Sequence, residues 1–407
     1  MKMKYIPQIS INDFDYELPN SRIAKFPLSQ RDTSKLLIYD KGKINEQIFS
    51  NITEFFNEKS LLVFNNTKVV HARIIFQKST GAQIEVFCLE PDMPRNYEQN
   101  FASTNECTWI CSVGNLKKWK DEVLKKKFTC NNIHDQLNVE KISLNNDLLK
   151  LKFTWKSALS FAQIIEICGK VPIPPYLKRE SMKIDNERYQ TVYSKFEGSV
   201  AAPTAGLHFS NDVLHSLKSK NICTEEITLH VGAGTFKPVK TEFANEHIMH
   251  GEHFFVKKST LITLIEHLEN ITAIGTTSVR TLESLYWLGC KILQNKGTVN
   301  LNVRQFEPYE NTNNANISAQ QSLQAIINYL EKKQLNEICA TTQIMIMPTY
   351  KLRIANRLIT NFHQPKSTLL LLVAAFVGSD WLKIYNYAMQ NNFRFLSYGD
   401  SSLLIPK

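Results

Sequence analysis

Two histidines lie at the ends of apolar runs within glycine-rich segments. His208 lies in residues 198–209, Gly-Ser-Val-Ala-Ala-Pro-Thr-Ala-Gly-Leu-His-Phe, and His230 lies in residues 227–236, Ile-Thr-Leu-His-Val-Gly-Ala-Gly-Thr-Phe. An imidazole titrates near neutral pH and can take or give a proton during a reaction. Ordered glycine turns let the backbone approach a ligand closely and present its N–H groups. The two segments therefore predict a ligand site with His208 and His230 as catalytic groups.

A third histidine lies in a polar loop between an apolar strand and an apolar helix. Residues 361–368, Asn-Phe-His-Gln-Pro-Lys-Ser-Thr, bring an amide, an imidazole, an ammonium and two hydroxyls together. Loops at strand ends carry chemistry disproportionately often. His363 is therefore a further catalytic candidate, and Lys366 is a candidate anion contact. The alternative is a structural turn in which Ser367 only caps the next helix.

Gly275-Thr-Thr-Ser278 joins another predicted strand to a helix. This arrangement directs helix N–H groups at a polar ligand beside the strand ends. No Gly-x-Gly-x-x-Gly fingerprint accompanies it, so a dinucleotide site is not predicted. The alternative is a plain helix cap, with Arg280 on a solvated face.

Metal-binding spacings define a competing class. The run His247-Ile-Met-His-Gly-Glu-His253 suggests a metal hydrolase, but a zinc site would need His-Glu-x-x-His or a matched distant ligand. Cys107, Cys111, Cys130 and His134 are spaced like zinc ligands, yet the first two lie in a strand-like context. We expect no metal.

Composition favours a globular protein with a polyanionic partner. Lys and Arg number 48 against 38 Asp and Glu, which gives a formal charge of +10 over 407 residues. The longest apolar run, residues 369–377, is far too short to span a membrane. Eight cysteines without a Cys-x-x-Cys pair, and no apolar stretch after the first lysines, predict a cytoplasmic protein with reduced thiols.

Basic residues gather near aromatic ones in two places, around Trp119 and around Tyr176. Such surfaces neutralise phosphates and stack bases, although a solvated charged face is the commoner explanation. The candidate RNA contacts are Lys117, Lys118, Lys125, Lys126, Lys127, Arg179 and Arg188.

The pattern of predicted strands and helices that must position these groups changes along the chain. Short alternating strands fill residues 66–159, whereas strands alternate with helices after residue 200, and two strand-like runs precede residue 65. We predict a three-layer, mixed-sheet α/β domain, residues 1–65 and 160–407, with a small β-barrel domain, residues 66–159, inserted. Further expectations are a strand over 343–347 and a disordered loop over 311–321.

The order of the motifs resembles the S-adenosylmethionine:tRNA ribosyltransferase-isomerase family of queuosine biosynthesis. The resemblance covers nearly the whole chain, through Ile23-Ala-Lys-Phe-Pro27, Arg31-Asp-Thr-Ser34, Asn65-Asn-Thr-Lys-Val69, Gly81-Ala-Gln-Ile-Glu85, Val171-Pro-Ile-Pro-Pro-Tyr176, Glu187-Arg-Tyr-Gln-Thr-Val-Tyr193, the two glycine-rich segments, Gly275-Thr-Thr-Ser-Val-Arg280, residues 361–368 and Tyr398-Gly-Asp400. It implies transfer and isomerisation of the ribosyl unit of S-adenosylmethionine onto 7-aminomethyl-7-deazaguanine in tRNA. The products would be epoxyqueuosine in tRNA, adenine and methionine.

S-adenosylmethionine would be a consumed co-substrate, tRNA the macromolecular partner, and the protein a monomer. Such chemistry needs a base, a proton donor for the departing adenine, and groups that hold hydroxyls and the carboxylate. Residue chemistry suggests His208, His230 and His363 for proton transfer. The substrate-binding candidates are Arg31, Asp32, Glu85, Thr204, Gly206, Thr276, Thr277, Ser278, Arg280, Asn361, Lys366 and Asp400.

Two positions depart from the family pattern Asn-Asp-Thr-Arg, because Asn66 and Lys68 replace a carboxylate and a guanidinium. Lysine cannot reproduce a bidentate arginine contact. The alternative function is accordingly an RNA-binding protein on the same scaffold that is non-catalytic or acts on another acceptor.

Overall fold

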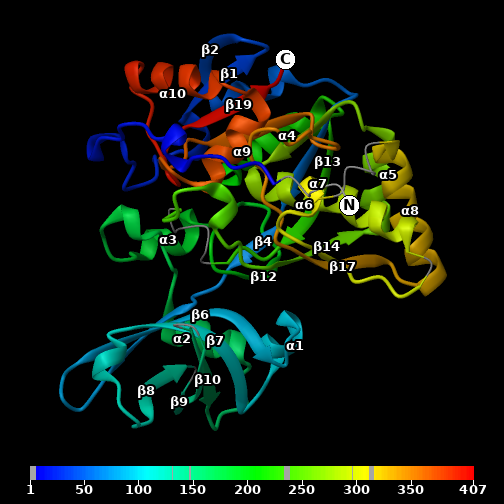
Figure 1. The fold of residues 1–407 in the computed structure, drawn as a ribbon. Helices are drawn as coiled ribbons and strands as arrows, with labels where there is room; N and C mark the ends of the chain where they lie inside the picture. Colours follow the sequence, from blue (N-terminus) through cyan, green and yellow to red (C-terminus); the bar gives the residue numbers. More distant parts are fainter. Residues whose placement is uncertain (1–5, 131, 146–147, 233–238, 296, 311–315) are drawn as a thin grey trace.

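The computed structural model describes residues 6–130, 132–145, 148–232, 239–295, 297–310 and 316–407. A large α/β domain forms the upper part of the molecule and a smaller β domain lies below it (Figure 1). The predicted mixed α/β class is confirmed.

Ten strands form the central sheet. Their order is β16 (Asn302–Val303), β17 (Glu337–Thr342), β14 (Glu252–Lys257), β13 (Cys223–Leu229), β3 (Leu61–Asn65), β15 (Ile271–Ile274), β18 (Arg357–Asn361), β19 (Ser401–Ile405), β1 (Lys35–Asp40) and β2 (Lys43–Ile48). The neighbours β13, β3, β15 and β18 run parallel, so their carboxyl ends share one edge. Strands β19 and β1 run the other way and start at that same edge.

Helices cover both faces of this sheet. They are α4 (Asn211–Ser219), α5 (Lys258–Glu266), α6 (Thr276–Gln294), α8 (Ala319–Lys333), α9 (Thr368–Val377) and α10 (Asp380–Gln390), while the short helices α3 (Lys183–Arg188) and α7 (Glu307–Glu310) lie in connections. Along β3, Leu61 and Val63 belong to the core that contains α6. Leu62 and Phe64 belong to the core that contains α4. Alternate side chains of a strand face opposite sides, so the sheet is buried on both.

Short 3-10 helices lie in the connections. They are η1 (Ile11–Phe14), η2 (Asn20–Arg22), η3 (Arg31–Thr33), η4 (Phe49–Phe55), η5 (Leu116–Lys118), η6 (Pro175–Leu177), η7 (Thr204–His208) and η9 (Ala244–Glu246). Of these, η3 and η7 carry residues of the candidate site.

The apolar helix α9 has the bounds that its flanking residues predict. Ser367 Oγ accepts a hydrogen bond from the Leu370 amide at 3.2 Å, and Gly378 ends the helix at φ +61°. In the described part of the chain no single helix is long and apolar enough to cross a membrane. Helices α9 and α10 meet that criterion only as a pair bent by 111°, on length and composition alone.

One local prediction was wrong, and a second was wrong in its last part. Residues 343–347 form no strand, because β17 ends at Thr342 and the Ile344 amide turns back to the Thr342 hydroxyl at 3.0 Å. The predicted disordered loop over 311–321 falls partly on residues 311–315, which lie outside the described residues. Its last part starts α8 instead, because Ser318 and Gln321 form a reciprocal capping box.

The lower domain is a seven-stranded antiparallel sheet with two helices. The strand order is β11 (Gly169–Lys170), β5 (Arg73–Gln77), β6 (Gln83–Met93), β7 (Glu106–Gly114), β10 (Leu148–Thr154), β9 (Ile133–Asn145) and β8 (Leu124–Cys130), and the helices are α1 (Tyr97–Ala102) and α2 (Phe161–Cys168). Lys126 of β8 donates to the Ile75 carbonyl of β5 at 3.0 Å, so the far strand curls back toward the start of the sheet.

A two-stranded parallel sheet, β4 (Thr67–Val69) and β12 (Phe196–Ser199), lies between the two domains. Strand β4 follows β3 directly, so the chain leaves the large domain at the carboxyl edge of the parallel strands. The inserted sheet is therefore attached beside the strand ends that carry the candidate residues (Figure 1).

Glu283 of α6 fixes the loop that precedes β18. Its fully buried carboxylate accepts hydrogen bonds from the Tyr350 hydroxyl at 2.8 Å and from the amides of Arg353, Ile354 and Ala355 at 2.9–3.0 Å. Burial raises the pKa of Glu283, against the lowering effect of these donors.

We expect Glu283→Gln to lower the free energy of unfolding by roughly 3 kcal/mol, because the amide NH2 would face donors where an oxygen now accepts. Urea unfolding at pH 7 measures this. The control Glu331→Gln changes an exposed ion pair and should cost less than about 0.5 kcal/mol. Equal losses in both variants would contradict the role assigned to Glu283.

Candidate functional site

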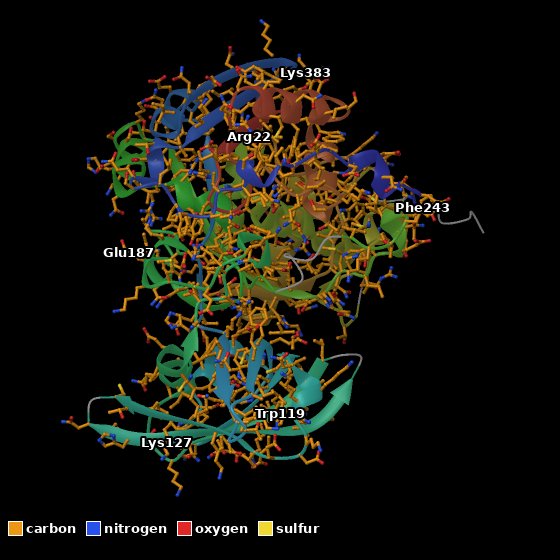
Figure 2. All side chains as sticks on the ribbon, turned by 90° about the vertical axis from the view of Figure 1, so that its left-hand side faces the viewer. Arg22, Trp119, Lys127, Glu187, Phe243 and Lys383 are labelled. Atoms are coloured by element: carbon orange, nitrogen blue, oxygen red, sulfur yellow. The ribbon has the colours of Figure 1, made fainter. Side chains whose placement is uncertain are left out.

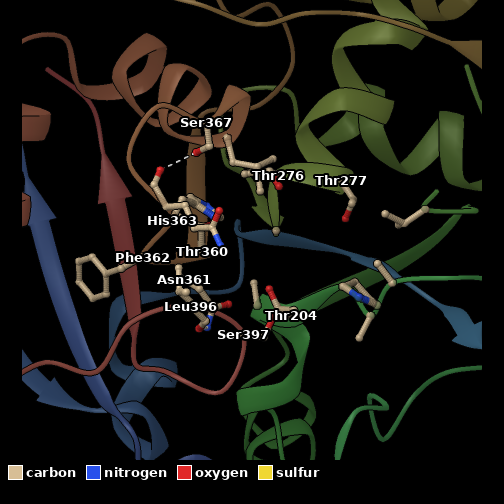
Figure 3. Close-up of a pocket in the computed structure, with 18 of the residues that line it drawn as sticks. Thr204, Thr276, Thr277, Thr360, Asn361, Phe362, His363, Ser367, Leu396 and Ser397 are labelled. Carbon is tan, nitrogen blue, oxygen red and sulfur yellow. Dashed lines mark hydrogen bonds between the residues drawn. The ribbon is translucent and has the colours of Figure 1, made fainter. Parts of the chain in front are cut away.

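A cavity of about 70 Å³ lies at the carboxyl edge, beside the ends of β15 and β18 (Figure 3). That volume has room for roughly five water molecules, so it suits a sugar-sized polar group. Five residues predicted as catalytic or substrate-binding line it, namely Thr204, Thr276, Thr277, Asn361 and His363.

Two polar atoms in the lining of this strand-end cavity lack a partner. Asn361 Oδ1 and Thr277 Oγ1 are buried and accept or donate no hydrogen bond within the described residues. Buried polar groups in proteins are nearly always paired. The orphaned carbonyl oxygen and hydroxyl therefore fit a ligand that brings hydroxyl groups into the cavity.

The side-chain amide nitrogen of Asn361 determines the tautomer of the His208 ring. Asn361 Nδ2 lies 3.1 Å from the Leu396 carbonyl, which can only accept, and 3.1 Å from His208 Nε2. His208 Nε2 must then accept, so its proton is on Nδ1, which lies 2.8 Å from Ser34 Oγ. Both ring nitrogens of His208 are engaged by the protein.

His208 is accordingly a structural imidazole in this arrangement. It is buried, and its ring packs against Phe49 with centroids 5.1 Å apart. Burial, and then the charges of Arg394 and Arg31, lower the pKa of His208 to about 3. At neutral pH the ring is uncharged and holds two segments together.

His363 lines the strand-end cavity with one ring nitrogen engaged. Its Nε2 lies 2.9 Å from Thr360 Oγ1, its amide donates to the Tyr385 hydroxyl at 3.0 Å, and its carbonyl accepts from the Tyr16 hydroxyl. Burial lowers the pKa of His363 to about 3. Neutral His363 is thus held firmly by its backbone and is able to accept a proton.

His230 follows β13 and faces the inserted domain. Tyr97 of α1 stacks on its ring at 4.4 Å between centroids, and His230 Nδ1 lies 3.2 Å from Thr67 Oγ1. Burial, and then His253, lower the pKa of His230 to about 3. The imidazole belongs to the large domain, but the insert supplies one of its walls.

His230 also lines a second cavity, of about 620 Å³, between α1 and strand β13. This volume lies within the range of roughly 300–1,000 Å³ typical of ligand sites, which often form between domains. Aromatic rings of Tyr97, Phe101, Phe196 and Phe255 line it beside the carboxylate of Glu226. Both oxygens of Glu226 are paired with Lys195, 2.7 Å away, which lines the same cavity. The aromatic rings therefore make the junction cavity suited to a flat ring.

Asn66, at the position where the family pattern leads us to expect an aspartate, lies at this junction cavity. Its Nδ2 donates to Glu226 Oε2 at 3.0 Å, and its Oδ1 accepts from Thr228 at 2.7 Å. An aspartate at this position would be repelled electrostatically by the Glu226 carboxylate. Lys68 pairs with Glu197 at 2.9 Å, so the cation at this position keeps a carboxylate partner.

The glycines of the first segment approach the protein's own side chains. A Cβ on Gly198, at φ +145°, would lie 2.6 Å from the His230 ring, and one on Gly206 would collide with the Tyr193 hydroxyl. At these two glycines the backbone lies close to side chains of the protein itself, whereas the sequence predicted a close approach to a ligand. Residues 233–238 of the second segment lie outside the described residues.

Other substrate-binding candidates take part in internal contacts. Arg280 is buried, pairs with Glu252 and donates to the Ile344 carbonyl at 3.2 Å, so it does not lie on a solvated face. Ser278 donates to the Ile274 carbonyl at 2.8 Å. The N-cap of α6 is Gly275 with no side-chain cap, which leaves Thr276 and Thr277 at the strand-end cavity.

Two acidic candidates lie apart from that cavity. Asp32 accepts from Ser210, the N-cap residue of α4, at 2.6 Å. Asp400 accepts from the Lys35 and Arg394 amides and pairs with the Arg394 guanidinium at 2.9 Å.

Lys366 and Glu85 are also paired elsewhere. Lys366 lies 3.0 Å from Asp15. Glu85 is on β6 of the insert, 3.4 Å from Arg73 Nε. Neither lines the strand-end cavity.

The basic candidates separate into exposed and structural groups. Lys117, Lys118, Lys125 and Lys127 are exposed on the insert, whereas Lys126 is half-buried. Arg179 forms a bidentate pair with the buried Asp185, both bonds being 2.7 Å. Hydrogen bonds from Arg179, the Met182 amide and Tyr398 hold the pKa of Asp185 low, although burial alone would raise it.

Sequence reasoning missed several residues that shape the site. Tyr97 comes from the insert, Ser34 and Thr67 bind histidine rings, and Thr360 precedes His363 by three residues. Only Thr360 had a local signal, its position before the polar loop. In the described part of the chain, no group of three His, Cys, Asp or Glu side chains is arranged to hold a metal ion.

Fold and site together define a two-domain α/β protein with a polar, sugar-sized cavity at the carboxyl edge of its parallel strands and a basic β insert. The family model described as "Queuosine biosynthesis protein" matches residues 11–404. The chain belongs to this family, whose curated relatives are named S-adenosylmethionine:tRNA ribosyltransferase-isomerase. The family predicted from the motifs is confirmed.

Two such relatives match over nearly their whole length. The protein of Sulfurihydrogenibium sp. (strain YO3AOP1) is 37% identical over 404 residues, covering 98% of this chain and 100% of the relative. That of Rickettsia bellii (strain OSU 85-389) is 36% identical over 412 residues, with the same coverage. A crystal structure of S-adenosylmethionine tRNA ribosyltransferase from Thermotoga maritima aligns with 97% of this chain and 100% of that one, at 26% identity and a TM-score of 0.46.

The three neutral histidines predict acid sensitivity. Their pKa of about 3 in the folded state lies below the ordinary value near 6.5, so only the unfolded chain gains these protons as pH falls. The free energy of unfolding should therefore decline from about pH 6.5 towards 3, by up to ~1.4 kcal/mol per pH unit for each ring.

Denaturant unfolding across this pH window measures the slope. His208→Gln, which removes one titrating ring, should flatten it relative to the native protein, whereas His215→Gln, at an exposed position on α4, should not. The same slope in all three proteins would count against a neutral His208.

Proposed function

We propose that this protein transfers and isomerises the ribosyl unit of S-adenosylmethionine onto 7-aminomethyl-7-deazaguanine at the tRNA wobble position. Epoxyqueuosine in tRNA, adenine and methionine are the products, and S-adenosylmethionine is consumed. Family membership over residues 11–404 supports the activity. The observation that carries the site is the pair of orphaned polar atoms, Asn361 Oδ1 and Thr277 Oγ1, in a sugar-sized cavity.

In this proposal the ribosyl unit occupies the strand-end cavity and the deazaguanine enters the junction cavity. The consecutive residues His230 and Val231 line the two cavities, His230 the junction and Val231 the strand ends. A base taken out of its stack is commonly held between aromatic side chains. The aminomethyl group is a cation, and in this proposal it replaces Lys195 as the partner of Glu226.

The sulfonium acidifies protons on the adjacent ribose carbon, so the reaction needs a neutral base close to the sugar. His363 lines the sugar-sized cavity, and the low pKa of its ring keeps it unprotonated at neutral pH. His230 lies where the acceptor amine would approach and can take the proton released when the new C–N bond forms. His208 positions Asn361.

We further propose that the curled sheet of the insert is a small barrel that binds tRNA through its exposed lysines, and that the protein is a cytoplasmic monomer. The domain boundaries that we propose are those predicted, 66–159 for the insert and 1–65 with 160–407 for the α/β domain. Helix α2 and strand β11 follow the second boundary in sequence but complete the sheet and core of the insert. Incubation with S-adenosylmethionine and tRNA carrying the deazaguanine tests the activity by mass spectrometry of the digested RNA. Epoxyqueuosine with adenine supports it, and tRNA binding without adenine release contradicts it.

Substitution of the histidines should separate their roles. We expect His230→Gln and His363→Gln each to lower kcat by about 10²- to 10⁴-fold, because each removes a proton-transfer group. His208→Gln should lower kcat less than tenfold while lowering the melting temperature, because its ring is already engaged at both nitrogens. Steady-state adenine release at saturating substrates gives kcat. A loss for His208→Gln as large as that for His363→Gln would reverse the assignment.

The exposed lysines of β8 should contribute to tRNA affinity. Changing Lys125 and Lys127 together to Ala should lower the slope of log affinity against log salt by about 2, or about 1 for each phosphate that is no longer neutralised. Lys126→Ala is the control, because that ammonium donates to the Ile75 carbonyl. An unchanged slope in the double variant would make these lysines a solvated face.

A further inference from the structure

Three arginines from distant parts of the chain line one small cavity. Arg31 lies on η3, Arg188 ends α3, and Arg394 precedes β19. The cavity also contains the hydroxyls of Ser34 and Ser397. It lies where β1 and β19 begin, at the carboxyl edge of the parallel strands, and His208 separates it from Asn361.

The partners of these guanidiniums leave positive charge unbalanced. Arg31 Nη1 donates to the Gln190 carbonyl at 3.0 Å and lies 3.5 Å from that of Leu207. Arg188 Nη1 donates to the Ser29 carbonyl at 3.0 Å. Within the described residues, only Arg394 of the three forms an ion pair, with Asp400.

The electrostatics of Arg31 agree with this excess of positive charge. Burial, and then the charge of Arg188, lower the pKa of Arg31, although Glu187, Tyr193 and Asp32 act in the opposite direction. Desolvation and repulsion thus outweigh the nearby acidic groups. Like charges held together in this way are stabilised by an anion, and guanidinium forks match the oxygens of a phosphate.

The position of the cluster selects the kind of anion. Arg188 is only half-buried, so an anion attached to a large molecule can reach it. Helix α3 and strand β8 lie on the same side of the molecule in Figure 1, and Figure 2 shows Glu187 and Lys127 along that side. The arginine cluster therefore extends the face that carries the exposed lysines of the insert.

We propose that Arg31, Arg188 and Arg394 form an oxyanion site at the mouth of this cavity, whose volume of about 20 Å³ admits one oxygen of a backbone phosphate of the bound tRNA. This inference rests on the proposed function for the identity of the RNA. The site would anchor the large-domain side of the tRNA while the insert holds another part. The carboxylate of S-adenosylmethionine is the other oxyanion in the reaction, and the experiment separates the two.

The test compares Arg188→Gln with Arg22→Gln. Arg22 is also half-buried and also donates to one backbone carbonyl, that of Met389 at 3.0 Å, but it lies outside the cavity. Arg188→Gln should weaken binding of deazaguanine-bearing tRNA about three- to tenfold and lower its salt slope by about 1, whereas Arg22→Gln should not. The KM for S-adenosylmethionine should stay unchanged in both.

Arg31→Lys checks the geometry, because it keeps the charge but loses the fork; it should weaken tRNA binding with a smaller change in slope. An unchanged salt slope in Arg188→Gln would overturn the site. A raised KM for S-adenosylmethionine with native tRNA affinity would overturn the phosphate and favour the carboxylate. Binding needs no turnover, so native protein that binds tRNA without releasing adenine would refute the proposed activity and leave this test valid.

Discussion

The candidate site depends on the parallel alignment of β13, β3, β15 and β18. Parallel neighbours place their carboxyl ends on one edge, and each of these ends is followed by a polar group that sequence alone leaves far from the others. Asn361 and Thr277 can face one cavity only because β18 and β15 are paired. The reversal at β19 adds Ser34 and Asp400 to the same edge, since β1 and β19 start there.

Burial decides what the histidines at this edge can do. An exposed imidazole would be partly protonated near neutral pH, whereas these three rings are kept neutral by desolvation. Their hydrogen bonds then distinguish them. His208 has both nitrogens occupied and links Ser34 to Asn361, while His230 and His363 each have one nitrogen bonded to a threonine. His208 thus has a structural role, whereas His230 and His363 are candidate bases.

Local signals in the sequence were sufficient for elements with their own start and stop residues. Ser367 and Gly378 bound α9 as predicted, and the strands after Ser34 and Ser60 form as expected. The apolar run 343–347 was wrongly predicted to be a strand. Its Gln343 and Met345 amides donate to the Val303 and Gln305 carbonyls, but the Ile344 amide turns back to the Thr342 hydroxyl. Hydrophobicity predicted its burial correctly, but not its backbone.

Contacts between distant segments could not be predicted. Arg280 pairs with Glu252, which is 28 residues away in the sequence, and Tyr97 of the insert stacks on His230 of the large domain. Neither partner follows from spacing, because each depends on how the insert and strand β14 are placed in the fold. The glycines show the same limit: Gly198 signalled a close approach, but only the fold identifies the approaching group as His230.

Because Tyr97 stacks on His230, the position of the insert relative to the large domain affects the pKa of His230. Tyr97 of the insert covers the His230 ring, so a displacement of the insert would expose that ring to water. Hydration favours the imidazolium and would move the pKa of His230 back towards its ordinary value. The pKa of His230 therefore depends on how closely the insert packs against the large domain. A bound RNA that pressed the two domains together would keep the His230 ring unprotonated.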